Sequence, residues 1–204
     1  MPPDSLRREY AALAPSYERR WRHYLVATTR HTLNALAPRA GERIFDVGCG
    51  TGFALSQLAN MPATLNLSGV DANCEMLARA RTRLPAEVVL ARSDARQLPF
   101  PNSHFDAVIT TSALHYFDEP AAAIGEMARV LAPGGRLIIT DWCRDFFVMF
   151  LCEHWLRIRK HPLGRVLNMQ ELTAYIEAAG LQVETRTRFR VRPAWGLMML
   201  TASR

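Results

Sequence analysis

The chain has 204 residues, the size of one ordinary globular domain, and can bury a core without disulfide bonds or a structural metal. Its 49% apolar and 22% charged residues are close to globular averages, which excludes a disordered or fibrous protein. Lysine plus arginine exceed aspartate plus glutamate, 25 to 19, a balance that suits a nucleic acid or an anionic membrane. Because Lys160 is the only lysine, a general preference for arginine explains this charge better.

The cysteines and the apolar segments indicate where the protein works. The four cysteines show no CxxC pair and no zinc-type spacing, which fits a reducing compartment. The N-terminus has no apolar signal segment, and the longest apolar run, 146–152, is far shorter than the ~20 residues that span a bilayer. We therefore expect a cytoplasmic protein without a transmembrane segment.

Helix and strand patterns alternate along the first two thirds of the chain. An apolar and aromatic stripe at helical spacing covers 16–36 and ends before Pro38. Strands then follow at 43–47, 66–70, 86–91, 105–110 and 136–141, with helices near 53–59, 75–83 and 121–131 between them. This alternation predicts parallel strands joined by crossover helices, an α/β fold.

The alternation stops after residue 141. An aromatic-rich helical segment is predicted at 144–168 and a further helix at 170–179, which Gly180 ends. Segments 181–191 and 197–202 are predicted to close the fold as an antiparallel pair. The sequence thus predicts a single doubly wound α/β domain, with a mostly parallel sheet and a final antiparallel strand.

A glycine cluster follows the first predicted strand directly and precedes a helix, at 48–52. Glycine lets the backbone approach a ligand, and a helix N-terminus offers free N–H groups and a positive dipole end. Asp71 ends the next strand, at the spacing used to hold ribose hydroxyls. These features predict a cofactor across the carboxyl ends of the first, second and fourth strands, with Asp71 accepting two hydroxyl hydrogen bonds.

Five segments resemble, in order, the motifs of class I S-adenosylmethionine-dependent methyltransferases, most closely the small ubiquinone/menaquinone-biosynthesis-like (type 11) group. They are IFDVGCGTG at 44–52, GVD at 69–71 with CEML at 74–77, SDA at 93–95 with LPF at 98–100, FDAV at 105–108 with LH at 114–115, and RVLAPGG at 129–135. The resemblance implies a Rossmann-like sheet, S-adenosyl-L-methionine as cofactor, S-adenosyl-L-homocysteine as product, and methyl transfer to a small, partly apolar acceptor.

The main alternative in the same fold class is a nicotinamide enzyme. Its fingerprint is GxGxxG, whereas this loop reads GxGxG. Asp46 would also repel a pyrophosphate beside the helix N-terminus, but it suits a cofactor that carries an ammonium group. Outside catalysis, a non-catalytic protein that binds the same cofactor would keep the same motifs.

The resemblance also implies which residues bind the cofactor. Asp46 and the glycine turn would face its methionine end, Asp71 its ribose, and Asp94 with the Ala95 amide its adenine. The full predicted set is Tyr17, Asp46, Gly48, Cys49, Gly50, Asp71, Ala72, Met76, Ser93, Asp94, Ala95 and Thr111. Asp46 could instead cap the loop, Met76 could be a core residue, and Cys49 is expected to be inert.

His115 follows the fourth strand at the edge where open α/β sheets bind ligands, so it is the candidate catalytic base and an acceptor contact. The same position often serves cofactor packing, and the activated cofactor makes a base optional. Tyr10 and Tyr17 resemble the family's YDxxAxxYD element, which folds over the cofactor, with Ala11 and Glu18 in place of the aspartates. Tyr10 is predicted to contact the acceptor; alternatively, these tyrosines only anchor an aromatic helix.

The segment 143–168 is predicted to be a helical insertion over the mouth of the active site. Residues 146–151 are apolar all round, so we expect the helix to be covered on every side. Phe147, Phe150 and Trp155 would wall the acceptor pocket, with Tyr17 opposite. The segment could instead pack on the sheet or form a homodimer interface. The other predicted parts are a helical lid at 1–40, a cofactor-binding core at 41–142, and a closing helix and strand pair at 169–204.

A row of alternating arginines, at 186, 188, 190 and 192, projects from one face of a strand. It could bind an anionic acceptor or RNA, or mark a charged edge strand that resists aggregation. The loop at 110–113 lacks the Asn/Asp-Pro-Pro-aromatic signature of base methylation, so nucleic acid is not expected, and an RNA or lipid methyltransferase stays the alternative. No His, Asp, Glu or Cys cluster has ligand spacing, so no metal is expected.

Overall fold

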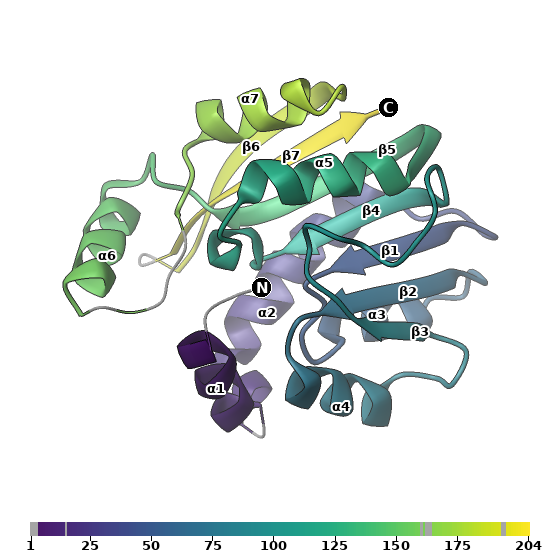
Figure 1. Ribbon diagram of the computed structural model, residues 1–204, viewed down its shortest axis with the longest axis horizontal. Coiled ribbons are helices and arrows are strands. Elements are labelled where there is room, and N and C mark those ends of the chain that lie inside the picture. The colour runs from purple at the N-terminus through teal and green to yellow at the C-terminus, as the bar shows by residue number, and fades with distance from the viewer. Residues whose placement is uncertain (1–3, 15, 160, 162–164, 193–194) are drawn as a thin grey trace.

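The computed structural model describes residues 4–14, 16–159, 161, 165–192 and 195–204. Its centre is a seven-stranded sheet in the order β3-β2-β1-β4-β5-β7-β6 (Figure 1). The strands are β1 (Arg43–Val47), β2 (Asn66–Asp71), β3 (Val89–Arg92), β4 (Phe105–Thr111), β5 (Leu131–Trp142), β6 (Gln182–Val191) and β7 (Trp195–Ser203). The first five strands run parallel, and β7 is antiparallel to both neighbours, β5 and β6. The predicted doubly wound α/β fold is confirmed.

Helices cover both faces of this sheet. They are α1 (Asp4–Leu13), α2 (Tyr17–Leu36), α3 (Phe53–Ala59), α4 (Cys74–Arg83), α5 (Pro120–Val130), α6 (Phe147–Ile158) and α7 (Met169–Ala178), with the 3₁₀ turn η1 (Leu114–Tyr116). In Figure 1, α5 and α7 lie in front of the sheet and α2 and α3 behind it. Each face therefore carries its own hydrophobic core.

The two cores arise from the period of two along the strands. Phe45 and Val108 pack with α5 and α7 on one face, whereas their neighbours Ile44 and Ile109 pack with α2, α3 and α4 on the other. Strands buried on both faces read as continuous apolar runs, which is why β1, β4 and β5 are readily found in the sequence.

The boundaries differ from the prediction at several places. The fifth strand begins at Leu131 instead of residue 136. The third strand begins at Val89 instead of residue 86, because the Val88 amide bonds to the Pro85 carbonyl in a turn. In the described part of the segment predicted as a helix over 144–168, only α6 is helical. The Arg144 amide bonds to the Leu167 carbonyl, so that the chain returns beside its own start. Residues 160 and 162–164 of that segment lie outside the described residues.

The expectation that α6 is covered on every side is wrong. Only Met149 and Glu153 are buried on this helix, because it contacts the rest of the chain along one narrow face. Among the helices that the structure describes, none has the combination of length and apolar character that crossing a membrane requires.

Candidate active site

A cavity opens at the carboxyl ends of β1, β2, β3 and β4, where the loops that follow these strands meet the N-terminal helices. The twelve residues predicted to bind a cofactor all line it, and so does Tyr10. Sequence reasoning missed several other lining residues, among them Thr29, Asn73, Arg96, Tyr116 and Phe117. Tyr116 and Phe117 follow directly on the Leu-His pair, so their place in the chain was a usable signal.

The glycine loop owes its path to backbone conformations that other residues rarely adopt. Gly48, Gly50 and Gly52 have φ angles of +79°, +53° and +72°. A Cβ on Gly48 would lie 2.5 Å from the Cβ of Ala113, on the loop after β4. Glycine at position 48 therefore lets the loops after β1 and β4 come together at the floor of the cavity.

Asp71 is held by the backbone on both of its oxygens. Its Oδ2 accepts a hydrogen bond from the Gly50 amide and its Oδ1 one from the Asn73 amide, each at 2.8 Å. Burial raises the pKa of this carboxyl, and the two amides oppose the rise. The carboxylate is thus fixed at the end of β2, and each oxygen keeps a lone pair for a hydroxyl donor.

Asp46 lies at the end of β1 and is buried, with 2% of its surface exposed. Its Oδ1 has no hydrogen-bond partner among the residues that the structure describes. Burial, and secondly the charge of Asp71, raise the pKa of this carboxyl to about 7. A buried acceptor without a partner is unfavourable unless a ligand supplies the donor, so the site favours a cationic group beside Asp46.

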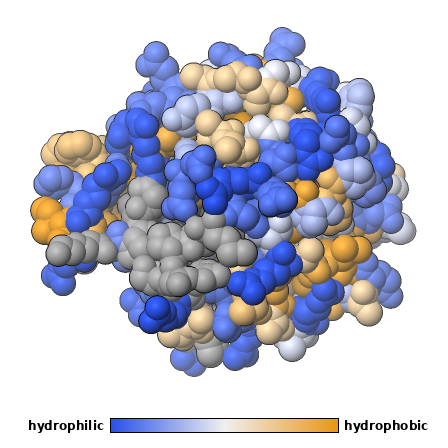
Figure 2. Space-filling view, in the orientation of Figure 1, coloured by the Kyte–Doolittle hydropathy of each residue, from blue (hydrophilic) through white to orange (hydrophobic). Residues whose placement is uncertain are grey.

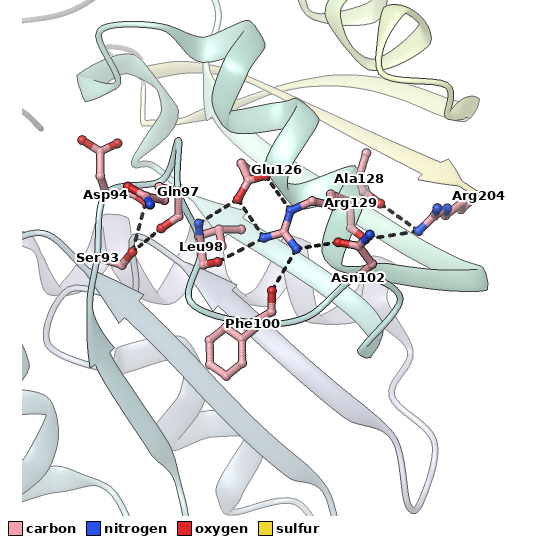
Figure 3. A network of polar contacts seen from close by, with 10 residues as sticks. All are labelled: Ser93, Asp94, Gln97, Leu98, Phe100, Asn102, Glu126, Ala128, Arg129 and Arg204. Carbon is pink, nitrogen blue, oxygen red and sulfur yellow. Dashed lines mark hydrogen bonds and ion pairs between the residues drawn. The ribbon is translucent and has the colours of Figure 1, made fainter.

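The loop after β3 forms one wall and is held from α5 (Figure 3). The Arg129 guanidinium donates to the carbonyls of Leu98 and Phe100, at 3.0 and 2.9 Å, and to the Asn102 side chain at 2.8 Å. Glu126 accepts from the Leu98 amide at 2.8 Å and also binds Arg129. A loop without regular structure is therefore anchored by two charged side chains of one helix.

Asp94, at the start of that loop, already has a strong partner. The Arg96 side chain donates to both Asp94 oxygens, at 3.1 and 3.0 Å, and Arg96 also pairs with Glu119. This guanidinium holds the pKa of the Asp94 carboxyl well below its usual range. The predicted contact of Asp94 with an adenine would have to share the carboxylate with Arg96.

The N-terminal helices close over the cavity by polar and aromatic contacts. The Tyr10 hydroxyl donates to the Tyr116 hydroxyl at 2.6 Å, and the two rings meet edge to face. Glu18 accepts from the Thr51 hydroxyl at 2.6 Å and pairs with Arg83 of α4. Glu18 therefore ties α2 to the glycine loop.

Comparison with known proteins identifies the family. Residues 45–139 match the family model described as a methyltransferase domain. The 27-O-demethylrifamycin SV methyltransferase of Amycolatopsis mediterranei (strain S699) is 32% identical over 181 residues, which are 83% of this chain and 66% of that protein. O-methyltransferase resE of Aspergillus sclerotiorum is 32% identical over 182 residues, 82% of this chain and 67% of that protein. The chain belongs to the class I S-adenosylmethionine-dependent methyltransferases.

Other matches agree with this family. The demethylmenaquinone methyltransferase of Beutenbergia cavernae is 33% identical over 168 residues, 81% of this chain and 66% of that protein. A putative methyltransferase in complex with the Haloferax volcanii Trm112 methyltransferase activator has the same fold, with a TM-score of 0.83, 20% identity and coverage of 96% and 97% of the two chains. The chain spans about two thirds of the length of the first curated relatives it matches.

The residues present in this family member fit S-adenosylmethionine. The unpartnered Asp46 Oδ1 offers an acceptor to the cofactor's ammonium group, and Asp71 offers its lone pairs to the ribose hydroxyls. The alternative that Asp46 caps the loop finds no support, since no amide of the described residues bonds to its Oδ1. Cys49 is buried, and burial raises the pKa of its thiol well above the ordinary value, as expected for an inert residue.

His115 does not line the cavity of this methyltransferase, contrary to the expectation. It is 3% exposed, its Nδ1 lies 2.5 Å from Asp141 Oδ1, and its ring stacks on Trp142 at 4.2 Å between centroids. The reason is the η1 turn, which directs Leu114 and His115 inward and leaves Tyr116 at the cavity. Nε2 of His115 has no partner among the described residues, and sequence reasoning missed Asp141 as its neighbour.

Phe147, Phe150 and Trp155 also lie outside the cavity lining. They are 74%, 51% and 54% exposed on α6, because this helix packs through Met149 and Glu153 instead. Tyr10 and Tyr17 lie together at the cavity, at 5.8 Å between ring centroids. The three side chains of α6 do not join them in the lining.

The arginine row on β6 makes contacts within the chain. Arg186 bonds to Thr173 and Glu177 of α7, Arg188 lies 3.5 Å from Asp145, and the Arg190 guanidinium lies 5.2 Å from the centre of the Phe146 ring. These partners favour the charged edge strand over an anion-binding or RNA-binding surface.

Proposed function

We propose that this protein transfers the methyl group of S-adenosyl-L-methionine to a small, partly apolar acceptor and releases S-adenosyl-L-homocysteine. One observation carries the proposal: Asp46, a buried carboxylate whose Oδ1 has no partner among the described residues, stands beside a backbone-locked carboxylate, Asp71, at the head of a GxGxG loop. The two carboxylates match the ammonium and the ribose diol of that cofactor. A nicotinamide dinucleotide would instead place its anionic pyrophosphate beside the glycine loop, where Asp46 repels it.

The chain's contribution to the reaction is mainly alignment and exclusion of water. The bound cofactor supplies a methyl group already activated by the sulfonium. Tyr10 and Tyr17 of the N-terminal helices, with Tyr116 opposite, would close the mouth and shield the reacting atoms. Holding two reactants in line supplies on the order of 7–11 kcal/mol, so a strong base is not required for an acceptor that ionises by itself.

A hydroxyl or ammonium acceptor would have to lose a proton, and His115 is the base that we propose for that case. Asp141 holds Nδ1, which leaves Nε2 to accept a proton once an acceptor reaches it. Replacing His115 with Gln should then lower kcat for such an acceptor and leave cofactor affinity unchanged. An unchanged kcat would return His115 to a packing role against Trp142.

We infer the class of acceptor from the side chains that line the cavity and from the names of two relatives. Two of the relatives named above are methyltransferases of demethylrifamycin and demethylmenaquinone, both small molecules. The lining adds aromatic and aliphatic side chains, among them Leu25, Phe53 and Phe117, to the polar groups of the loops. Methyl-labelled cofactor, incubated with a panel of phenols, hydroquinones and fatty acids, tests methyl transfer directly.

The binding site is tested by calorimetry with Asp71→Ala. The substitution removes the acceptor of two ribose hydrogen bonds, so cofactor affinity should fall by about 1.5–3 kcal/mol, roughly 10- to 150-fold. Asp106→Ala is the matched control, since Asp106 lies on β4 in an ion pair with Arg43, away from the cavity lining. Equal affinities of the two variants would refute the assignment, and binding without product on any acceptor would favour a non-catalytic protein.

A further inference from the structure

Helix α6 carries its apolar side chains on the outside. Met149 and Glu153 face the body of the protein, while six large apolar residues are between 36% and 74% exposed. They are Phe147, Val148, Phe150, Leu151, Trp155 and Ile158. We call these six residues the outer face of α6. In Figure 1 the helix projects at the left end of the molecule, and in Figure 2 hydrophobic colours gather at that end.

The helical period explains this arrangement. At 100° per residue, Phe147, Leu151 and Ile158 fall on the side opposite Met149, so the inward face is narrow and the outer face is wide. Glu153 lies buried at the inward face and forms an ion pair with Arg157 of the same helix, at 2.8 Å. A contiguous apolar face of this kind on a protein surface marks an interaction site.

Cations border the outer face. The segment 143–168 contains five basic residues and two acidic ones. Among the described ones, Arg157 and Arg159 are exposed at the end of α6, and the Arg159 guanidinium lies 4.8 Å from the centre of the Trp155 ring. Exposed Phe, Trp and Leu side chains bordered by arginines are the composition of helices that lie in the interface of an anionic bilayer.

A second copy of the chain fits the outer face less well. The exposed side chains of one helix offer on the order of 500 Å², below the about 800 Å² per partner of a stable interface. Pairing two copies through this helix would also bring the same cations together in a protein whose net charge is +6. An anionic lipid surface supplies both the apolar depth and the opposite charge.

We propose that the outer face of α6 docks on an anionic lipid membrane and brings the active site to an acceptor dissolved in the bilayer. This inference rests on the proposed methyl transfer and deepens it by naming the source of the acceptor. α6 follows the carboxyl end of β5, at the same edge of the sheet as the cavity. Beyond its end, His161 lies 3.3 Å from Glu9 of α1, the helix that brings Tyr10 to the cavity.

Vesicle flotation tests the docking surface on the full chain. The probes are phosphatidylcholine vesicles with and without phosphatidylglycerol, and the variant is Phe147→Ser with Ile158→Ser. The control replaces Val26 and Val89, two half-exposed apolar residues on other elements, with Ser. We expect the wild type and the control to float with anionic vesicles, and the α6 variant to bind them about tenfold less, since each lost side chain removes apolar contact with the acyl region.

Calorimetry on the same proteins separates this inference from the proposed function. Unchanged S-adenosylmethionine affinity in the α6 variant, together with lost flotation, supports the docking surface. Equal flotation of the variant and the wild type overturns it. The inference is also overturned if neither protein binds vesicles and light scattering shows that the wild type is a dimer and the variant a monomer. The outer face of α6 would then be an interface with a second copy. Absent cofactor binding in a wild type that still floats would contradict the proposed function alone.

Discussion

Replacing Asp46 with Asn should stabilise the cofactor-free protein while weakening its binding of S-adenosylmethionine. The substitution keeps the size of the side chain and removes the charge that the cofactor's ammonium group would pair with. In the absence of cofactor the buried charge has no partner at Oδ1 among the described residues, so it only opposes folding. Function and stability therefore make opposite demands at this position.

The magnitude follows from the pKa. Folding raises the pKa of the Asp46 carboxyl from 3.8 to about 7, so the folded state holds its proton more tightly than the unfolded state. Stability is lost as the pH rises from about 4 to 7, and the loss reaches on the order of 4 kcal/mol above pH 7. At pH 8, Asp46→Asn should recover most of this lost stability, which corresponds to a rise of roughly 8–16 °C in Tm. At pH 5 the gain in stability should be only about 1.5 kcal/mol.

Thermal unfolding of the cofactor-free protein at pH 5 and pH 8 measures this difference. Asp106→Asn is the control with the opposite sign, since Arg43 lowers the pKa of that partly exposed carboxyl and its loss should cost at most about 1 kcal/mol. Saturating cofactor should raise the Tm of the wild type more than that of Asp46→Asn. A gain that is equal at both pH values, or a lower Tm at pH 8, would refute the reasoning.

Three further predictions concern the loop, its anchor and metals. Gly48→Ala should lower the stability by roughly 1–3 kcal/mol and abolish cofactor binding, since the new Cβ would collide with Ala113. Gly50→Ala should have a smaller effect on both, because a Cβ there meets nothing within 4 Å. Calorimetry and thermal unfolding of the two variants compare these effects. Arg129→Gln should raise the cofactor Kd and lower the stability by about 1–3 kcal/mol, because the loop after β3 loses its hydrogen bonds to the guanidinium. A Kd equal to that of the wild type would show that the loop needs no anchor. Chelation should leave methyl transfer intact, and activity restored by one divalent ion would contradict this.

Much of the cofactor side of the protein could be predicted from sequence because its signals are local. The strand, glycine loop and helix at 43–59 are contiguous in the chain, and Asp71 follows one strand later. A loop at the carboxyl end of a parallel strand always reaches the same edge of the sheet, so residues after β1, β2, β3 and β4 meet without further information. Eleven of the twelve predicted lining residues lie at or after the end of a strand in this way, whereas Tyr17 of α2 was implied by the family resemblance.

The direction in which individual side chains point was decided by tertiary structure. Sequence placed His115 at the correct edge, but the η1 turn and the buried Asp141 hold it away from the cavity. The arginines of β6 alternate as expected, yet whether they were free depended on how the fold places Glu177 of α7 and Asp145 after β5. Such contacts have no periodic or local signal.

The clearest division lies in α6. Its sequence by itself determined a helix and an apolar surface, because period and hydropathy are properties of neighbouring residues. Which side of that helix faces the protein was decided only by the fold, where the burial of Met149 and Glu153 leaves the wider apolar side outward. Burial depends on what the rest of the chain places against a helix, and a sequence pattern carries no such information.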